Sequence, residues 1–387
     1  MSLATTPSLT LRQRVLSIAA VIASTVGVGV SYGIGYPITA LTLEQWGAPS
    51  WLNGLIGSAP ALAILICLPF FPKLVGRLGT IPAMALGCCF VGVGFLLMPL
   101  FPSPEAWLIL RFIMGAGLAL PWLVGETWIN TVATDKTRGR MLALYAMALF
   151  SGFAVGPFIL DQVGIDGWVP FLIGAGGIFL AVVPLVLAAA LAPRMPKHPD
   201  TGVFGAMLLA PVAMIAGVVG GVLEFGHFVM LPVYALQTGA GETEALRLLT
   251  LFIVGGIVLQ FIVGWLADKA SARTVLVGSA LLFALVAASL PITSDPVLRA
   301  AAVFVMGGLG VGFYTLSLTH IGQRVRVQDL AVANAAFLLT YQVGAMVGPT
   351  VSGVAMGIWQ PHGFVAAMIA AALIGALAMA LVRRTSL

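Results

Sequence analysis

The sequence predicts an all-α membrane protein of twelve transmembrane helices, arranged as two pseudo-symmetric six-helix bundles. Three observations lead to this fold class. Of the 387 residues, 60% are hydrophobic and only 8% are charged, whereas about a quarter are charged in soluble domains. The apolar runs are long and continuous, which in lipid favours helices over barrel strands. Landmarks also recur at one fixed separation, which indicates two homologous halves of equal length.

The repeat is clearest in a Gly-Pro step. The segment Gly152-Phe-Ala-Val-Gly156-Pro157 returns as Gly344-Ala-Met-Val-Gly348-Pro349, and 344 − 152 = 192 residues separate the copies. The same separation relates four further pairs: Gly29 and Gly221, Gly47 and Gly239, Leu74 and Leu266, Gly115 and Gly307. A register kept over that distance predicts two equivalent halves, as in transporters that rock one half against the other.

Twelve apolar stretches reach the length of about 20 residues that a membrane-spanning helix needs. They are 12–41, 51–72, 80–101, 106–131, 139–160, 168–192, 203–235, 244–266, 274–292, 296–321, 330–355 and 364–383. The longest polar break, 192–200, separates the sixth stretch from the seventh. We therefore expect an N-terminal six-helix bundle over 1–192, a cytoplasmic linker over 193–202 and a C-terminal six-helix bundle over 203–387.

Positive charge collects at one end of the predicted spans. Of the 18 Lys and Arg, that end holds 15, namely Arg12, Arg14, Lys73, Arg77, Lys136, Arg138, Arg140, Arg194, Lys197, Lys269, Arg273, Arg324, Arg326, Arg383 and Arg384. The opposite loops hold the acids Glu44, Glu105, Asp161, Asp166, Glu242, Glu244 and Asp295. The positive-inside rule then predicts cytoplasmic termini. The basic balance reflects topology, and no nucleic-acid partner is expected.

Three motifs connect the chain to a known family. One is the loop Gly264-Trp-Leu-Ala-Asp268-Lys-Ala-Ser-Ala-Arg273, another is Arg111-Phe-Ile-Met-Gly115-Ala-Gly117 in the fourth span, and the third is the paired Gly-Pro step. They resemble, in that order, the G-x-L-A-D-r-x-g-R loop, the R-x-x-x-G-x-G motif and the bend motif of the major facilitator superfamily. The resemblance covers nearly the whole chain. It implies a transporter that works by alternating access, and not an enzyme.

Three further segments, Trp122–Thr127, Arg138–Arg140 and Val332–Asn334, resemble the YcaD-type bacterial branch of that superfamily. This resemblance implies a multi-pass protein of the bacterial cytoplasmic (inner) membrane. It names relatives without naming a cargo.

Few ionisable side chains fall inside the predicted spans, where a charge is costly. They are Arg111 and Glu126 on the fourth span, Glu224 and His227 on the seventh, and His320 on the tenth. The resemblance implies that spans one, four, seven and ten line a central cavity. We therefore predict proton coupling through Glu126, Glu224, His227 and His320, and substrate contact through Arg111.

Each of these side chains also has a plainer interpretation. Glu126, between Trp122 and Trp128, either exchanges protons or ties its helix to a neighbour. Glu224 and His227 are three residues apart and share a helix face. The acid either holds the imidazole for proton transfer or for a cationic substrate, or the pair stabilises a break in the helix.

His320 either takes part in proton transfer or faces cytoplasmic water. Arg111 either meets an anionic group of the substrate or satisfies carbonyls of the glycine-rich first span, 27–35. Aromatic side chains on the cavity-lining spans provide stacking surfaces and hydroxyl groups for a substrate, or ordinary packing. These candidates are Tyr32, Tyr36, Trp122, Phe228 and Tyr314.

Small residues and charge pairs predict the moving parts. Gly156 and Pro157 are expected to shape one bundle, and Gly348 and Pro349 the other, because proline bends a helix and small residues let helices approach. By analogy with the family, two cytoplasmic charge groups are expected to latch the halves in the outward-open state. These groups are Asp268 with Arg273, and Asp135 with Arg138 and Arg140.

The resulting prediction is a secondary active transporter for a small organic solute, cationic or amphipathic, coupled to protons, with efflux by antiport preferred. Proton-coupled uptake and uncoupled facilitation remain alternatives, as does a membrane sensor or binding protein that kept the fold. The chain has no phosphate-binding G-x-x-x-x-G-K-[ST] loop, so gradients must supply the energy. We expect no cofactor and no metal; the partners are substrate, protons and the lipid bilayer, and the protein is a monomer.

Overall fold

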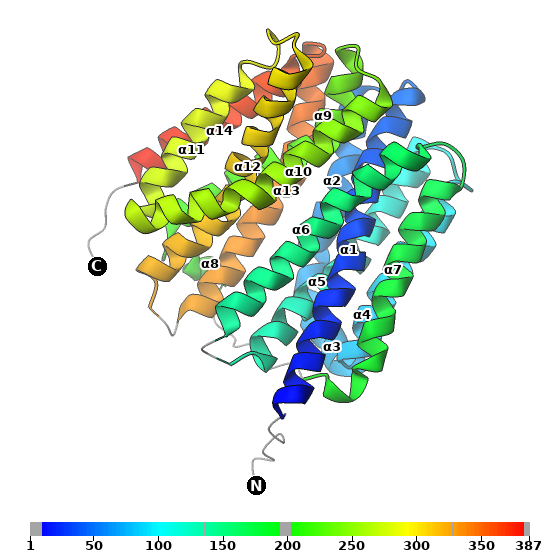
Figure 1. Cartoon of the computed structure of the whole chain (residues 1–387), viewed down its shortest axis with the longest axis vertical. Coiled ribbons are helices and arrows are strands. Elements are labelled where there is room, and N and C mark those ends of the chain that lie inside the picture. Colours follow the sequence, from blue (N-terminus) through cyan, green and yellow to red (C-terminus); the bar gives the residue numbers. More distant parts are fainter. Residues whose placement is uncertain (1–9, 135–136, 194–202, 327–328, 383–387) are drawn as a thin grey trace.

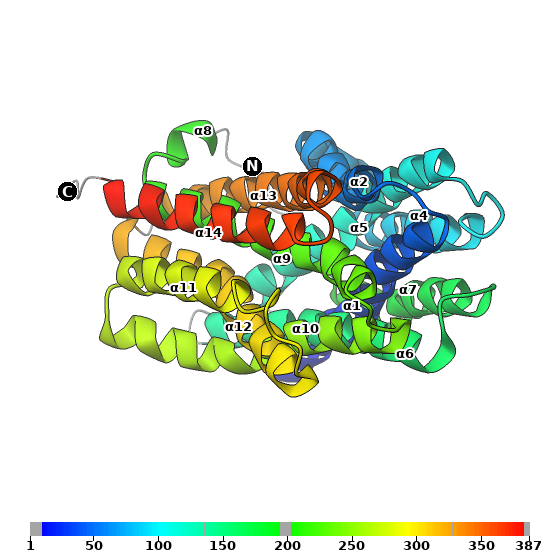
Figure 2. The same cartoon turned by 90° about the horizontal axis from the view of Figure 1, so that it is seen from above.

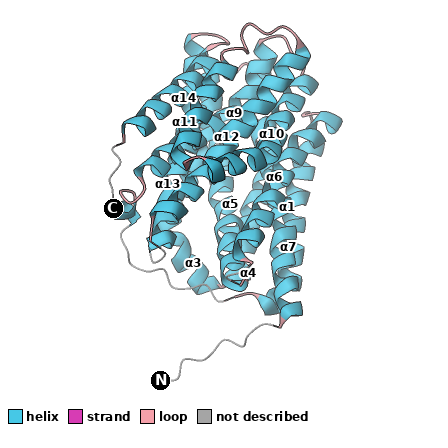
Figure 3. Ribbon diagram, turned by 60° about the vertical axis from the view of Figure 1, so that its left-hand side comes forward, coloured by secondary structure: helices cyan, strands magenta, loops and turns pink. Residues whose placement is uncertain are grey.

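The computed structural model describes residues 10–134, 137–193, 203–326 and 329–382, and its regular structure there is helical (Figure 1, Figure 3). The first half contains α1 (Leu11–Gln45), α2 (Ser50–Cys67), η1 (Leu68–Phe70), α3 (Phe71–Leu78), α4 (Thr80–Leu97), α5 (Pro104–Val132), α6 (Arg138–Val163), α7 (Val169–Leu187) and η2 (Ala189–Leu191). The second half contains α8 (Val203–Ala206), α9 (Pro211–Gln237), α10 (Glu242–Lys269), α11 (Ala272–Ala287), α12 (Pro296–Arg324), α13 (Leu330–Ile358) and α14 (Gly363–Leu381).

The predicted membrane-protein fold is confirmed. Among the described residues, 10 helices are long and apolar enough to cross a membrane, and α11 is a shorter apolar helix. Large apolar side chains cover the outside, for example Leu180 at 70% exposure and Ile374 at 68%. A surface of this kind is suited to lipid rather than water.

One predicted span differs from the structure at its start. The stretch 203–235 was expected to be one helix, but α8 ends at Ala206 and α9 begins at Pro211. Proline is favoured in the first turn of a helix, where its missing N–H removes no hydrogen bond. Ala210 precedes it with a non-helical ψ of 65°. The span that carries Glu224 therefore begins at Pro211.

The helices form two groups that lie side by side when seen from above (Figure 2). In the first group α1 packs on α5, α6 and α7, while α4 and α5 pack on each other. In the second group α9 packs on α12, α13 and α14, while α10 packs on α12. The linker predicted over 193–202 lies outside the described residues except for Pro193.

The tandem copy reappears in the packing, residue by residue. A Cβ added to Gly29 would meet the carbonyl oxygen of Leu149, and one added to Gly221 would meet that of Tyr341. Both members of the second pair follow the first by 192 residues (221 − 29 and 341 − 149). Gly152 against Val26 and Gly344 against Val218 repeat the relation. The two halves thus use the same backbone approaches, which only glycine permits at this spacing.

The main helix contacts between the two groups are those of α2 with α13, α6 with α10, α1 with α9, and α2 with α9. The α2–α13 contact is made of small residues. A Cβ on Gly54 would meet the Pro349 carbonyl, and one on Gly353 would meet the Ser50 carbonyl. Ser58 and Thr350 share a hydrogen bond of 2.8 Å. Pro349, predicted to bend its own bundle, therefore also contacts the other one.

Candidate functional site

An aromatic layer crosses from one bundle to the other near the middle of α1 and α9. It consists of Tyr32 and Tyr36 on α1, Phe153 on α6, and Phe225 and Phe228 on α9. Phe153 stacks on Phe228 with ring centroids 5.3 Å apart, and Tyr36 lies 5.7 Å from Phe225 and 6.1 Å from Phe228. Tyr36 and Phe228 are almost completely buried. The layer is thus a dry contact between the bundles, made by aromatic faces.

Glu224 lies beside this layer and is only 3% exposed. Its carboxylate accepts a hydrogen bond from the hydroxyl of Tyr341 on α13. Tyr341 in turn packs edge-on against Phe225 and against Tyr314 of α12, whose centroid is 5.2 Å away. A buried acid of this kind needs such a donor when it is charged, because burial without a hydrogen bond is costly.

Glu126 lies on α5 in the first bundle and is half-buried. It is in electrostatic range of the hydroxyl groups of Tyr145 on α6 and Tyr314 on α12. Tyr314 is also in electrostatic range of Glu224. One tyrosine of the second bundle therefore lies near two acids, one on each side of the interface.

The two indoles expected to shield Glu126 do not both lie beside it. Trp128 is fully buried in the core of the first bundle, where its Nε1 donates to Ser17 Oγ at 2.8 Å. Two residues along a helix are about 200° apart, so Trp128 and Glu126 face different ways. Trp122 is half-buried, and its carbonyl accepts a 3.0 Å hydrogen bond from the Tyr145 hydroxyl.

Arg111 is 5% exposed and lies on α5 with its guanidinium carbon 4.7 Å from the centre of the Tyr36 ring. Gly35 makes room for it, because a Cβ there would lie 2.7 Å from Nη1. Its Nε is buried without an acceptor. Among the described residues no acid pairs with Arg111 and no carbonyl of the first span accepts from it. The expected role of satisfying α1 carbonyls therefore does not match the structure.

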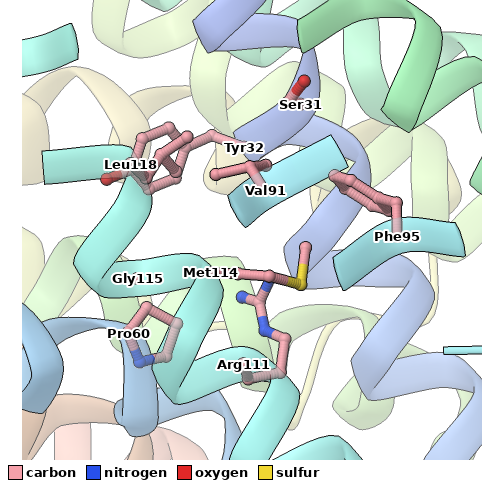
Figure 4. A pocket seen from close by; sticks show the side chains of 9 residues that line it. All are labelled: Ser31, Tyr32, Pro60, Val91, Phe95, Arg111, Met114, Gly115 and Leu118. Carbon is pink, nitrogen blue, oxygen red and sulfur yellow. The ribbon is translucent and has the colours of Figure 1, made fainter. Parts of the chain in front are cut away.

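A cavity of about 10 Å³ adjoins the guanidinium, which is room for about one water molecule. Figure 4 shows the Arg111 side chain leaving α5 and ending beside Met114. The lining residues are Ser31, Tyr32, Pro60, Val91, Phe95, Arg111, Met114, Gly115 and Leu118. The buried Arg111 guanidinium therefore contacts the Tyr36 ring and this small cavity, and no described acid serves as its counter-ion.

His227 does not pair with Glu224, contrary to the shared face that their spacing predicts. The imidazole is fully buried and stacks on Phe252 at 4.6 Å, with Phe283 and Phe364 edge-on. Its Nδ1 lies 2.6 Å from the Leu223 carbonyl, and Nε2 has no partner. Three residues turn a helix by about 300°, so the side chains of Glu224 and His227 point about 60° apart. This offset places His227 inside its own bundle.

His320 is also buried, at 5% exposure, so it does not face water as one interpretation had it. It lies near the end of α12 in electrostatic range of Arg324 and Arg273. No contact joins it to the acids beside the aromatic layer in the described part of the chain. Glu126 and Glu224 are thus both in electrostatic range of Tyr314, whereas no described contact joins His227 or His320 to them.

The predicted latch stays a prediction, because the structure describes the side chains of its basic residues only. Arg273 donates from Nη2 to the carbonyls of Ala380 and Val382, 2.8 and 2.7 Å away, in its own bundle. Asp135 and the side chain of Asp268 lie outside the described residues. Arg138 begins α6, and Arg140, two residues further along, is exposed. Gly156 and Gly348 pack their helices on Gly33 of α1 and Val222 of α9, respectively.

The described polar contacts between helix ends of the two bundles lie at the end opposite to Leu11, which is the upper end in Figure 1. We call these contacts the distal closure. They are Gln45 to Glu242 at 2.8 Å, Gln237 to Glu44 at 2.9 Å, and Arg247 to Asp161 at 3.1 Å. The Asp161 side chain is only 4% exposed, and its Oδ1 has no partner.

Sequence reasoning missed the distal closure. It also missed Phe153 and Phe225, which belong to the aromatic layer, and Tyr341, which packs beside it. Phe153 and Tyr341 each had a signal in the sequence. Phe153 lies inside the first Gly-Pro step, and Tyr341 follows Leu149, a close contact of Gly29, by 192 residues (341 − 149). Of the closure residues, only Glu44, Asp161 and Glu242 enter the sequence-based prediction, as charges that indicate topology.

Comparison with known proteins supports one family. The sequence model of the Major Facilitator Superfamily matches residues 20–248 and 213–386. The uncharacterized MFS-type transporter YfkF of Bacillus subtilis (strain 168) is 26% identical over 331 residues, which cover 84% of this chain and 85% of YfkF. The uncharacterized MFS-type transporter YcaD of Escherichia fergusonii is 25% identical, over 82% of this chain and 83% of YcaD.

Two solved structures share the fold. One is a bacterial homolog to the human lysosomal transporter Spinster, in an inward-facing and occupied conformation, with a TM-score of 0.78 and 15% identity over 98% of both chains. The other is a mutant of the nucleoside transporter NupG, with a TM-score of 0.75 and 13% identity over 94% of this chain and 99% of NupG.

Proposed function

Because this chain belongs to the Major Facilitator Superfamily, we propose that it is a proton-coupled secondary transporter whose coupling acid is Glu224. It moves a small organic solute across the cytoplasmic membrane by alternating access between its two bundles, 1–192 and 203–387. The observation that carries the proposal is the buried Glu224–Tyr341 hydrogen bond beside the aromatic layer that joins the bundles.

The position of Glu224 links its protonation to the contact between the bundles. Phe225 and Phe228, one residue and one turn further along α9, make the ring contacts with Tyr36 and Phe153. When Glu224 is charged, its carboxylate accepts the hydrogen bond from the Tyr341 hydroxyl. When Glu224 is protonated, its carboxyl group can also donate a hydrogen bond. Exchange between these two protonation states alters the hydrogen bonding on one side of the aromatic layer. The gain or loss of one such hydrogen bond is enough to shift the balance between two conformations of nearly equal free energy.

Glu126 is the second proton-carrying acid in this proposal. It is in electrostatic range of Tyr314, whose ring packs on Tyr341, and the Tyr341 hydroxyl donates to Glu224. Hydroxyl groups both donate and accept, so a proton relay between the two acids would pass through these tyrosines. The proposed relay leaves out His227, which packs on Phe252, Phe283 and Phe364, and His320, which lies near the end of α12.

The contacts between the bundles also support a direction of opening. They lie at the distal closure and in the aromatic layer, and the positively charged ends of the helices are at the opposite end. With the positive ends in the cytoplasm, these contacts close the structure toward the outside. Both termini are then cytoplasmic, and the molecule acts as a monomer in the inner membrane.

For the substrate, the surroundings favour a cationic or amphipathic organic molecule. Glu126 and Glu224 supply negative charge, and the aromatic faces of Tyr32, Tyr36 and Phe228 supply stacking surfaces. Arg111 lies behind Tyr36, within its own bundle. We propose efflux in exchange for protons, on the strength of the Gly-Pro steps that pack α6 on α1 and α13 on α9.

Purified protein in liposomes with an imposed pH gradient tests this function. A panel of fluorescent organic cations, such as ethidium, is the probe, and internal pH and probe efflux are followed together. We expect probe flux with proton counterflow, lost in Glu224→Gln and reduced in Glu126→Gln. Glu105→Gln, an exposed acid in the first turn of α5, is the matched control. Probe flux without proton flux indicates a facilitator, and binding without flux indicates a sensor; either result rejects the proposal.

A further inference from the structure

A lipid-facing groove lies at the end of the second bundle where α11 begins and α14 ends. Its volume is about 530 Å³, and it is lined by Ser271, Arg273, Thr274, Val277, Ala380, Leu381 and Val382. In Figure 1 and Figure 2, α11 and α14 run side by side along the outer edge of the molecule. We propose that this groove binds the headgroup of an anionic phospholipid.

Arg273 supplies the charge that the headgroup requires. Its two hydrogen bonds both leave from Nη2, to the carbonyls of Ala380 and Val382. A guanidinium has five N–H donors, and among the described residues the others on Arg273 have no acceptor. The bonds to α14 hold the side chain in place, so a phosphate oxygen meets a pre-oriented donor group.

Two hydroxyl groups stand beside the guanidinium. Ser271 and Thr274 are exposed and share a hydrogen bond of 2.7 Å, and Ser271 Oγ also accepts from the Thr274 N–H at 3.2 Å. They begin α11, whose helix dipole adds a partial positive charge at this point. The polar part of the groove therefore presents donors and positive charge, which complements a phosphodiester.

Below the polar part, the wall of the groove becomes apolar and continues as a seam for acyl chains. Leu381 is 69% exposed, and Leu377 and Ile374 follow it along α14 at 61% and 68%. On α11, Leu281 and Leu285 are 50% and 70% exposed. A free phosphate ion has no apolar part that could contact this seam. A phospholipid can place its headgroup in the polar part and its acyl chains along the apolar part. The occupant that matches the chemistry is thus a lipid with an anionic head.

The neighbouring surface also belongs at a membrane interface. Lys269 lies with its ammonium 3.8 Å from the ring centre of Trp265, and indole rings and lysines are typical of the headgroup level. At 16 residues, α11 is about 24 Å long, less than the roughly 30 Å of the hydrocarbon core. A short helix draws headgroups toward its end, which brings them to Ser271 and Thr274.

Thermal unfolding of the full-length protein in detergent micelles tests the groove. Phosphatidylglycerol, phosphatidylcholine and inorganic phosphate are added separately at equal concentrations, and bound lipid is counted by native mass spectrometry. We expect phosphatidylglycerol to raise Tm by several degrees and to bind about tenfold more tightly than phosphatidylcholine. Thr274→Trp, which fills the groove and leaves Arg273 in place, abolishes this preference, and Arg273→Gln weakens it.

Leu298→Trp places the same bulk at an exposed site at the other end of the bundle and keeps the preference. Three results overturn the proposal. Equal shifts from both lipids would mean that the site does not recognise charge, and an equal shift from inorganic phosphate would mean a free-anion site. An unchanged preference for phosphatidylglycerol in both Thr274→Trp and Arg273→Gln would place the lipid elsewhere. None of these results depends on what the protein transports.

Discussion

At the scale of single residues, the Glu224 carboxylate and the Arg111 guanidinium are the two buried charges near the aromatic layer, and they are treated differently. Glu224 has a hydroxyl donor from another helix. Arg111 has an aromatic ring and a small cavity, with Nε left unpaired. A satisfied group is suited to reversible proton exchange, whereas an unsatisfied one carries a standing energetic cost.

Tyr341→Phe removes the donor from Glu224 and leaves the ring. We expect proton-coupled flux to fall by about tenfold or more, because the acid loses the partner that stabilises its charged form. Tyr234→Phe is the matched control: it removes a hydroxyl that is buried without a partner in the same helix bundle. Parallel flux assays in liposomes compare the two. Equal losses in both variants would show that the Tyr341 hydrogen bond has no specific role.

Gly35→Ala should destabilise the protein because its new methyl group meets Arg111 Nη1. Overpacking of this kind costs about 1–3 kcal/mol. Combining it with Arg111→Met removes the obstructing group, so most of the loss should be recovered, and a double-mutant cycle measures the coupling. Denaturant unfolding of the four proteins provides the values. Strictly additive effects would mean that the guanidinium does not occupy this position.

At the scale of helices, the distal closure lies where α6 meets α10 and where α1 meets α9 and α10, beside the contact of α2 with α13. The polar contacts there are few and mostly exposed, and such pairs contribute about 0–1 kcal/mol each. The small residues of α2 and α13 let the two backbones touch over several turns. We infer that backbone packing holds the closure and that the ion pair biases it.

Gly353→Ala should open the distal closure, because the added methyl group meets the Ser50 carbonyl of the other bundle. Gly357→Ala is one turn away on the same helix, where a Cβ meets nothing within 4 Å, and should behave like wild type. The readout is the maleimide labelling rate of a cysteine placed at Ser58, which is 3% exposed, in a background without native cysteines. Equal labelling rates for the two variants contradict the expected role of this contact.

Arg247→Gln removes the ion pair with Asp161 and leaves that acid buried without a partner. We expect labelling at the same Ser58 cysteine to increase several-fold, which corresponds to a bias of about 1 kcal/mol. Arg326→Gln breaks an exposed pair with Asp329, 3.0 Å apart, within the second bundle, and should leave labelling unchanged. An unchanged rate in Arg247→Gln would remove the ion pair from the closing mechanism.

At the scale of the whole molecule, the fold follows directly from the sequence. Continuous apolar runs, few charges and a repeat of 192 residues (344 − 152) dictate helices in lipid and two equivalent bundles. The repeat even predicts which glycines touch which carbonyls, as Gly29 with Leu149 and Gly221 with Tyr341 demonstrate. Composition and the register of the repeat are properties of long segments, so a fold prediction based on them stays correct when the bounds of single helices are misplaced by a few residues.

The site was predictable in part. Glu224 and Glu126 could be identified because acids are rare in spans, but nothing in the sequence marks Tyr341 as the partner of an acid 117 residues away. His227 shows how a spacing rule fails. Three residues leave a 60° offset, and the packing against Phe252, Phe283 and Phe364 decides its direction. The distal closure depends on contacts between helix ends of different bundles, which local patterns do not encode.

The central claim is that protonation at Glu224, with Glu126, sets the balance between the two openings of the transporter. The most direct test is the spin-label distance between Trp51 on α2 and Ile358 on α13, both exposed at the distal end, measured in liposomes at mildly acidic and mildly alkaline pH. The account predicts a distance distribution that shifts with pH in the wild type and is fixed in the Glu126→Gln/Glu224→Gln double variant. A double variant that still responds to pH as the wild type does would contradict it.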